Sequence, residues 1–213
     1  MIGLGSYAYF WQQSGRVDEP LSLIDVLHDT RAQDVGLFQI CDYTPLMTMS
    51  AAEIADAASV ARDLGIEIEL GTKGIVPDHL ETYEQVPTDD LIALIERIGS
   101  DRLGICLDPA NVVARLETPR CVVERCAPLT KNVHVKDFAF ARQDGWVGFT
   151  YSGAAMGTGL HDYPHLLTTI RPREREINEI VEHWLPWQGD AETTIRTERE
   201  WTRITLEHLR STS

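Results

Sequence analysis

The sequence predicts an α/β fold in which parallel strands alternate with helices. Short apolar runs rich in β-branched residues recur along the 213-residue chain, and amphipathic stretches with helix-capping signals separate them. Parallel strands need long crossover connections, which helices usually supply. Hydrophobic residues make up 43% of the chain, enough for one sizeable core, so a single domain over residues 1–213 is expected.

The individual elements follow from these patterns. The apolar runs expected as strands span residues 2–10, 35–41, 66–70, 103–107, 132–135 and 177–181. The amphipathic stretches expected as helices span residues 21–31, 50–64, 87–98, 119–126, 163–170 and 191–209. In the second of these helices, Ser50 and Glu53 form a capping box and Gly65 supplies the stop signal.

Two architectures fit this alternation, a doubly wound open sheet and a (β/α) barrel. A doubly wound sheet predicts a glycine-rich phosphate loop after an early strand, but Gly3 and Gly5 lie inside the first strand with no third glycine in phase. A barrel predicts polar residues at the carboxyl ends of many strands, facing one mouth. Five residues satisfy this prediction: Asp42, Lys73, Asp108, His134 and Glu182. The sequence therefore predicts a TIM-barrel-like fold, incomplete or distorted because only about six strands are recognisable.

Three of these strand-end residues are candidate metal ligands, namely Asp108, His134 and Glu182, whereas Asp42 and Lys73 are expected at the surface of the mouth. Strands of one sheet that each end in such a residue can build a cation site from distant parts of the chain. Other interpretations are open for each residue. Asp108 could cap a turn before Pro109, His134 could be a buried core histidine, and Glu179 competes with Glu182 for the same role.

The segments around these residues resemble the sugar phosphate isomerase/epimerase superfamily, the xylose isomerase-like TIM barrels that include AP endonuclease family 2 relatives. The resemblance rests on residues 104–111, on residues 133–137, on residues 157–164 and on Glu182 after its strand. Their order and spacing extend over most of the chain. The resemblance implies that Asp108, His134 and Glu182 are three ligands of one divalent cation, Mn, Mg or Zn, held at the barrel mouth.

The fourth ligand implied by the resemblance is a glutamate, and the chain departs from the family pattern where it is expected. Between Gly65 and Pro87 members of the family carry more than one additional βα unit, so this chain looks shortened in the middle. Glu81 is the candidate for the missing ligand. The same residues could instead begin the next helix, which would leave Glu81 solvated and the site with three protein ligands.

The resemblance implies a metal-dependent isomerase or epimerase that moves a proton through an enediolate of a small sugar, sugar phosphate or hydroxyketone. Glu81 and Glu182 would serve as catalytic base and acid. Substrate binding is expected from Asn111, Lys136 and Asp137, which lie beside the ligands. Two alternatives are a dehydratase or lyase on the same scaffold and a shortened barrel that binds ligand without turnover.

The composition limits the partners. With 19 Lys and Arg against 33 Asp and Glu, the formal charge of -14 repels nucleic acid and anionic lipid, so neither is expected as a partner. No apolar run approaches the length of a membrane span, and the cysteines lack Cys-x-x-Cys spacing, so a cytoplasmic protein with reduced thiols is expected. An open six-strand sheet would expose its edges, and a homo-oligomer could cover them.

Overall fold

The computed structural model describes residues 1–41, 44–71, 79–143, 145 and 147–212. The chain divides into two compact units. The central unit holds Met1 and Val76–Ile180, and the terminal unit holds Ile2–Ile75 and Val181–Ser213. Two of the predicted strand-end residues, Asp42 and Lys73, lie outside the described residues.

Three adjacent parallel strands of the central unit carry or precede the candidate site residues. They are β4 (His79–Glu81), β5 (Gly104–Leu107) and β6 (Thr130–Val135), and β5 lies between the other two. The register pairs Glu81 with Cys106 and Leu107 with Val133. The carboxyl ends of the three strands therefore meet at one edge of the sheet.

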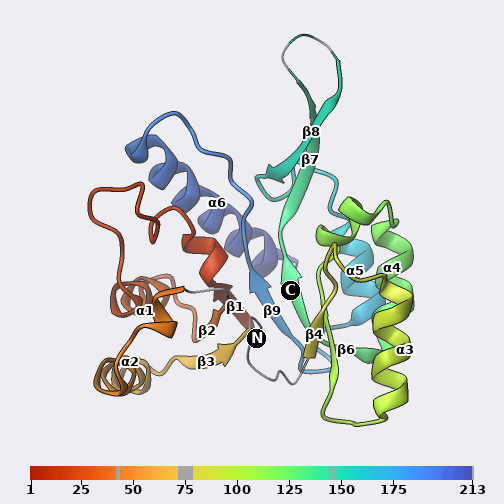
Figure 1. The fold of residues 1–213 in the computed structure, drawn as a ribbon, viewed down its shortest axis with the longest axis horizontal. Helices are drawn as coiled ribbons and strands as arrows, with labels where there is room; N and C mark the ends of the chain where they lie inside the picture. Colours follow the sequence, from red (N-terminus) through yellow and green to blue (C-terminus); the bar gives the residue numbers. More distant parts are fainter. Residues whose placement is uncertain (42–43, 72–78, 144, 146, 213) are drawn as a thin grey trace. The chain divides into compact units, whose positions relative to one another are not determined.

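The helices of the central unit group together beside these strands (Figure 1). They are α3 (Thr88–Ile98), α4 (Pro119–Cys126) and α5 (Tyr163–Ile170), with single 3₁₀ turns at Asn111–Arg115 and Ala127–Leu129. Each helix buries an apolar stripe, such as Leu91 and Ile95 in α3 and Leu166 and Ile170 in α5. Strand β9 (Asn178–Val181) ends at the boundary of the unit.

An antiparallel hairpin follows β6 directly. Its strands are β7 (Asp137–Arg142) and β8 (Phe149–Ala154), paired from Asp137 with Ala154 to Arg142 with Phe149. Figure 1 shows this hairpin extending beyond the parallel strands of its unit. This hairpin was not predicted from the sequence.

The terminal unit repeats the βα pattern with strands β1 (Ile2–Gly5), β2 (Leu37–Ile40) and β3 (Glu67–Leu70), all parallel with β2 in the middle. Helices α1 (Leu23–Ala32) and α2 (Ala51–Leu64) pack against each other beside them. The predicted caps of α2 are confirmed, because Ser50 and Glu53 form the capping box and Gly65 takes the left-handed conformation. The first predicted strand was too long, since Ser6–Tyr9 form a 3₁₀ turn; a second such turn spans Thr44–Met47.

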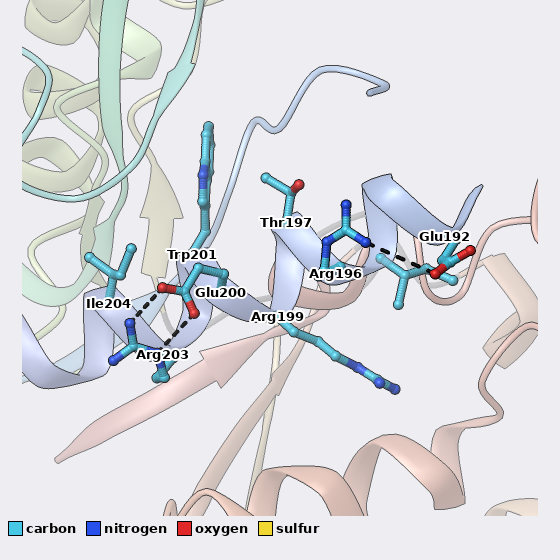
Figure 2. A pocket seen from close by; sticks show the side chains of 9 residues that line it. Glu192, Arg196, Thr197, Arg199, Glu200, Trp201, Arg203 and Ile204 are labelled. Atoms are coloured by element: carbon cyan, nitrogen blue, oxygen red, sulfur yellow. Dashed lines mark hydrogen bonds and ion pairs between the residues drawn. The ribbon is translucent and has the colours of Figure 1, made fainter. Parts of the chain in front are cut away.

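The long helix α6 (Ala191–Ser211) completes the terminal unit. One face holds Glu198, whose buried carboxylate accepts hydrogen bonds from the backbone N–H of Trp11 (2.8 Å) and Gln12 (3.0 Å). The opposite, solvated face carries ion pairs that stabilise the helix along its length, and Figure 2 shows them lining a surface hollow of α6. These pairs are Glu192 with Arg196 and Glu200 with Arg203.

The α/β architecture of an incomplete TIM barrel is confirmed, with one more strand than predicted. Among the described residues β1, β2, β4, β5, β6 and β9 are each followed by a helix, directly or after a short turn or the hairpin. Strand β3 is followed by β4, which is the strand that was not predicted. A single domain over residues 1–213 stays a prediction. In the part of the chain that the structure describes, no helix combines the length and apolarity needed to cross a bilayer. The four cysteines are free thiols, and Cys121 alone among them is exposed.

Candidate metal centre

The carboxyl ends of β4, β5 and β6 bring together Glu81, Asp108 and His134. One potential ligand atom from each residue lies within 4.8 Å of the others. His134 Nδ1 is 3.3 Å from Glu81 Oε1 and 3.7 Å from Asp108 Oδ2. Ligands bound at about 2.0–2.2 Å to one ion lie roughly 3.0–3.5 Å apart, so these separations are close to those of a coordination shell.

The two carboxylate oxygens of Asp108 contact different groups. Oδ1 accepts the backbone N–H of Ala110 (2.9 Å) and Asn111 (3.1 Å), which makes the turn after β5. Oδ2 faces His134 and Lys136 instead. The backbone N–H of Asp108 donates to Thr82 Oγ1 (2.8 Å), and that hydroxyl donates to the carbonyl of Asp108 (3.1 Å). The turn interpretation and the ligand interpretation of Asp108 are therefore compatible, because one oxygen serves each.

Glu81 is the last residue of a strand and not the first turn of a helix, since α3 begins at Thr88. Asn111 holds its side chain in place: Nδ2 donates to Glu81 Oε1 (2.7 Å) and to the carbonyl of Thr82 (3.2 Å). Asn111 Oδ1 is buried and has no hydrogen-bond partner among the described residues. An acceptor in this position could meet a substrate hydroxyl or the water shell of a cation.

Lys136 lies directly after β6 and forms a buried ion pair with Asp108. Its Nζ is 2.6 Å from Asp108 Oδ2, and the two side chains are 4% and 0% exposed. Burial by itself would raise the pKa of Asp108, but the Lys136 ammonium and His134 outweigh it and hold that pKa well below its usual range. The carboxylate at the centre of the cluster is therefore ionised, as a metal ligand must be.

The donor set fits the cation that the resemblance implies. Two carboxylates and one imidazole suit Mg, Mn or Zn, which prefer oxygen or mixed oxygen and nitrogen ligands. Glu81, with a side chain 25% exposed, is the most accessible of the three residues, so open coordination positions would face that side. The described residues of the central unit thus contain a possible three-ligand metal group, without identifying the metal.

Glu182, the predicted fourth ligand, is buried one residue beyond the end of β9 and belongs to the terminal unit. Its competitor Glu179 has a different task. The hydroxyl of Tyr163 in α5 donates to Glu179 Oε1 (2.6 Å), so this carboxyl faces the helical side of β9. Burial raises the pKa of Glu179. Glu182 as a ligand stays a prediction.

Asp137 was expected to bind substrate, and the structure gives it four backbone partners. Its oxygens accept the N–H groups of Phe138 (2.8 Å), Gly157 (2.9 Å), Gly159 (2.8 Å) and His161 (2.9 Å). A Cβ on Gly159 would lie only 2.3 Å from Asp137 Oδ1, so this approach requires glycine. These contacts make Asp137 the anchor of the segment between β8 and α5.

Two residues near the cluster were missed by the sequence analysis. Thr82 clamps the backbone of Asp108, as described above. Tyr151, from the unpredicted strand β8, donates to the carbonyl of Ala110 (2.7 Å) and so ties the hairpin to the turn after β5. Burial, and after it the charge of Asp108, raises the pKa of Tyr151. No sequence signal marked either residue, because each depends on pairing between distant segments.

Comparison with known proteins supports an enzyme. The chain is 46% identical to the 3-oxo-isoapionate decarboxylase of Pectobacterium atrosepticum over 259 aligned residues, which cover 98% of this chain and 94% of that protein. Because this chain has only 213 residues, at least 46 aligned positions have no counterpart here. The chain is therefore shorter than this relative, and the central location of the shortening stays a prediction.

One solved structure supports the fold. The probable 3-DHS dehydratase AsbF of Bacillus anthracis matches with a TM-score of 0.62 at 10% identity, covering 94% of this chain and 98% of that chain. A xylose isomerase domain protein from Planctomyces limnophilus matches with a TM-score of 0.49 at 18% identity, covering 89% of this chain, which spans only 64% of that longer one. The family model described as "Xylose isomerase-like TIM barrel" matches residues 43–205. The chain therefore belongs to the xylose isomerase-like TIM barrel family.

Proposed function

We propose that this chain is a divalent-metal-dependent decarboxylase that acts on a small 3-oxo sugar acid. The observation that carries the proposal is the 46% identity to a 3-oxo-isoapionate decarboxylase across 98% of the chain. The cluster of Glu81, Asp108, His134 and Lys136 supplies chemistry suited to that reaction.

The reaction requires stabilisation of negative charge on one oxygen. When a 3-oxo acid loses carbon dioxide, the electron pair of the broken carbon–carbon bond moves onto the 3-oxo oxygen and gives an enolate. A proton then returns to the carbon that carried the carboxylate. A bound divalent cation would supply Lewis-acid stabilisation of that oxygen.

Each residue of the cluster has its own role in the proposal. Glu81, Asp108 and His134 hold the cation, and Lys136 places a buried positive charge beside the same oxygen, where the low local dielectric strengthens its effect. Asn111 positions Glu81 and offers its buried Oδ1 to a substrate hydroxyl.

Glu182 is our candidate for returning the proton, because Asn111 and His134 engage Glu81. Asp137 acts indirectly in this scheme. Asp137 accepts four backbone hydrogen bonds that shape the segment after the hairpin, and these contacts favour a positioning role for Asp137 over direct substrate binding.

The expected isomerase or epimerase would use the same enolate-stabilising groups but would begin with proton removal instead of carbon–carbon cleavage. Both reactions can be followed in one experiment. The protein is incubated with Mn²⁺ or Mg²⁺ and 3-oxo-isoapionate, and released carbon dioxide is measured; in parallel, a ketose in D₂O is followed by NMR for deuterium uptake and epimer formation.

We expect metal-dependent carbon dioxide release that is lost in the D108N and H134A variants. Deuterium uptake or epimer formation from the ketose, with no carbon dioxide from the 3-oxo acid, would instead favour the isomerase or epimerase. Metal binding without either reaction would support the alternative that the chain is a shortened barrel that binds ligand without turnover. The exposed sheet edges could be covered by self-association or removed by closure into a smaller, distorted barrel, and light scattering on the same sample distinguishes a homo-oligomer from a monomer.

A further inference from the structure

Lys136 and the proposed metal ion compete for the same atom. Asp108 Oδ1 is already engaged by two backbone N–H groups, so Oδ2 is the oxygen that Asp108 can offer to a cation. The ammonium of Lys136 lies 2.6 Å from that same Oδ2. A cationic group of the chain itself therefore occupies the position beside the candidate ligands.

The surroundings make simultaneous occupation unfavourable. Lys136 and Asp108 are 4% and 0% exposed, so little water screens charges placed there. A divalent ion bound to Oδ2 and an ammonium on the same oxygen would be like charges in close contact within a medium of low dielectric constant. The carboxylate of Glu81 is 25% exposed and offers a second anionic partner only on the open side of the cluster.

Lys136 also has a structural reason to be there when no metal is bound. An ionised carboxylate as deeply buried as Asp108 needs a counter-charge, because an unpaired buried charge is strongly destabilising. The ammonium supplies it and keeps Oδ2 pointing toward His134 Nδ1, at 3.7 Å. The ligand group is thereby preorganised before a metal arrives.

We propose that Lys136 is an exchangeable internal cation: it neutralises Asp108 in the metal-free protein, and a divalent ion displaces it from Oδ2. The displaced ammonium is then available to an anionic oxygen of the substrate. Lys136 consequently weakens metal binding in the absence of substrate. This inference rests on the part of the proposed function that puts a divalent cation here, and it does not depend on which reaction follows.

Affinity for Mn²⁺ alone, measured by titration calorimetry on the full chain, gives the first test. The K136M variant removes the competing charge, and K131M is the matched control, because Lys131 lies on the same strand but is exposed, with its Nζ on the carbonyl of Asp101. We expect K136M to bind Mn²⁺ at least tenfold more tightly than wild type and K131M to stay within about twofold. If K136M does not fold, K136Q replaces it.

A second test follows the displacement directly, by NMR of wild-type protein whose lysine side chains are labelled with ¹⁵N. Addition of diamagnetic Mg²⁺ should shift the Lys136 Nζ signal and leave that of Lys131 in place. Equal Mn²⁺ affinity in wild type and K136M, or a Lys136 signal that does not move at saturating Mg²⁺, overturns the exchange but leaves the proposed decarboxylase intact. Absence of Mn²⁺ binding in every variant overturns both.

Discussion

The D137A substitution should destabilise the chain far more than loss of one exposed carboxylate would. The Asp137 side chain is buried and accepts four backbone N–H groups at 2.8–2.9 Å. Hydrogen bonds to a charged acceptor contribute about 1.5–3 kcal/mol each, and water can replace part of this at Gly157, which is exposed, and at Gly159, which is half-buried. A net loss of about 1–1.5 kcal/mol per donor gives a fall of about 4–6 kcal/mol in the free energy of unfolding.

Urea unfolding followed by circular dichroism measures this loss, and D162A is the matched control. Asp162 is exposed. It caps α5 through a hydrogen bond from the N–H of His165 (3.1 Å) and pairs with Arg120 at the surface (3.1 Å), so its removal should cost about 1–2 kcal/mol. Hydrogen exchange should also become faster at the amides of Gly157, Gly159 and His161 in D137A. If D137A loses no more stability than D162A and those amides stay protected, the anchoring role is wrong. A raised KM with unchanged stability would then favour the substrate-binding role expected from the sequence.

Three further predictions concern single residues. G159A should lower the free energy of unfolding by about 2–3 kcal/mol in urea titrations, because its Cβ would overlap the Asp137 carboxylate; unchanged stability would contradict that packing. N111A should weaken Mn²⁺ binding about tenfold in calorimetry, since Glu81 loses the amide that orients it, and wild-type affinity would count against this role. Burial raises the pKa of Glu198 from 4.5 to about 7. Between these two pH values the folded protein keeps Glu198 protonated while the unfolded chain does not, so the free energy of unfolding falls as the pH rises from 4.5 to 7. In urea unfolding at pH 4.5 and 7.5, the free energy of unfolding should drop by about 3 kcal/mol less in E198Q than in wild type. An identical pH dependence in both proteins would refute the raised pKa of Glu198.

Elements with strong local signals were predictable from the sequence. The bounds of α4 and α5 agree with the predicted ranges, and the capping box at Ser50 and the glycine at position 65 fixed both ends of α2. Strand β4 was missed because it has only three residues, His79–Glu81, and no β-branched run. The first strand was overextended because the aromatic residues after Gly5 favour a strand locally but form a 3₁₀ turn in the fold.

The candidate site was predictable only in part, for a related reason. Asp108 and His134 end or follow strands long enough to recognise, and a group containing both is present in the central unit. Glu81 remained undecided because the residues around it could equally have begun a helix after the third strand; they form β4 instead, and α3 begins at Thr88, close to its predicted start. The hairpin that carries Tyr151 depends on cross-strand pairing between β7 and β8, which a scan for βα alternation does not detect.

The candidate ligand group lies in the part of the chain that the inferred shortening would leave intact. Glu81, Asp108 and His134 come from β4, β5 and β6, neighbouring strands whose pairing lies wholly within the central unit. The contacts that orient them, from Thr82, Asn111 and Lys136, also lie within that unit. The shortening inferred from the sequence falls between Gly65 and Pro87, where the chain passes from β3 of the terminal unit to β4 of the central unit. Loss of βα units at this crossing removes neither the three strands nor their supporting residues. The local geometry for binding a cation therefore does not require a full-length barrel.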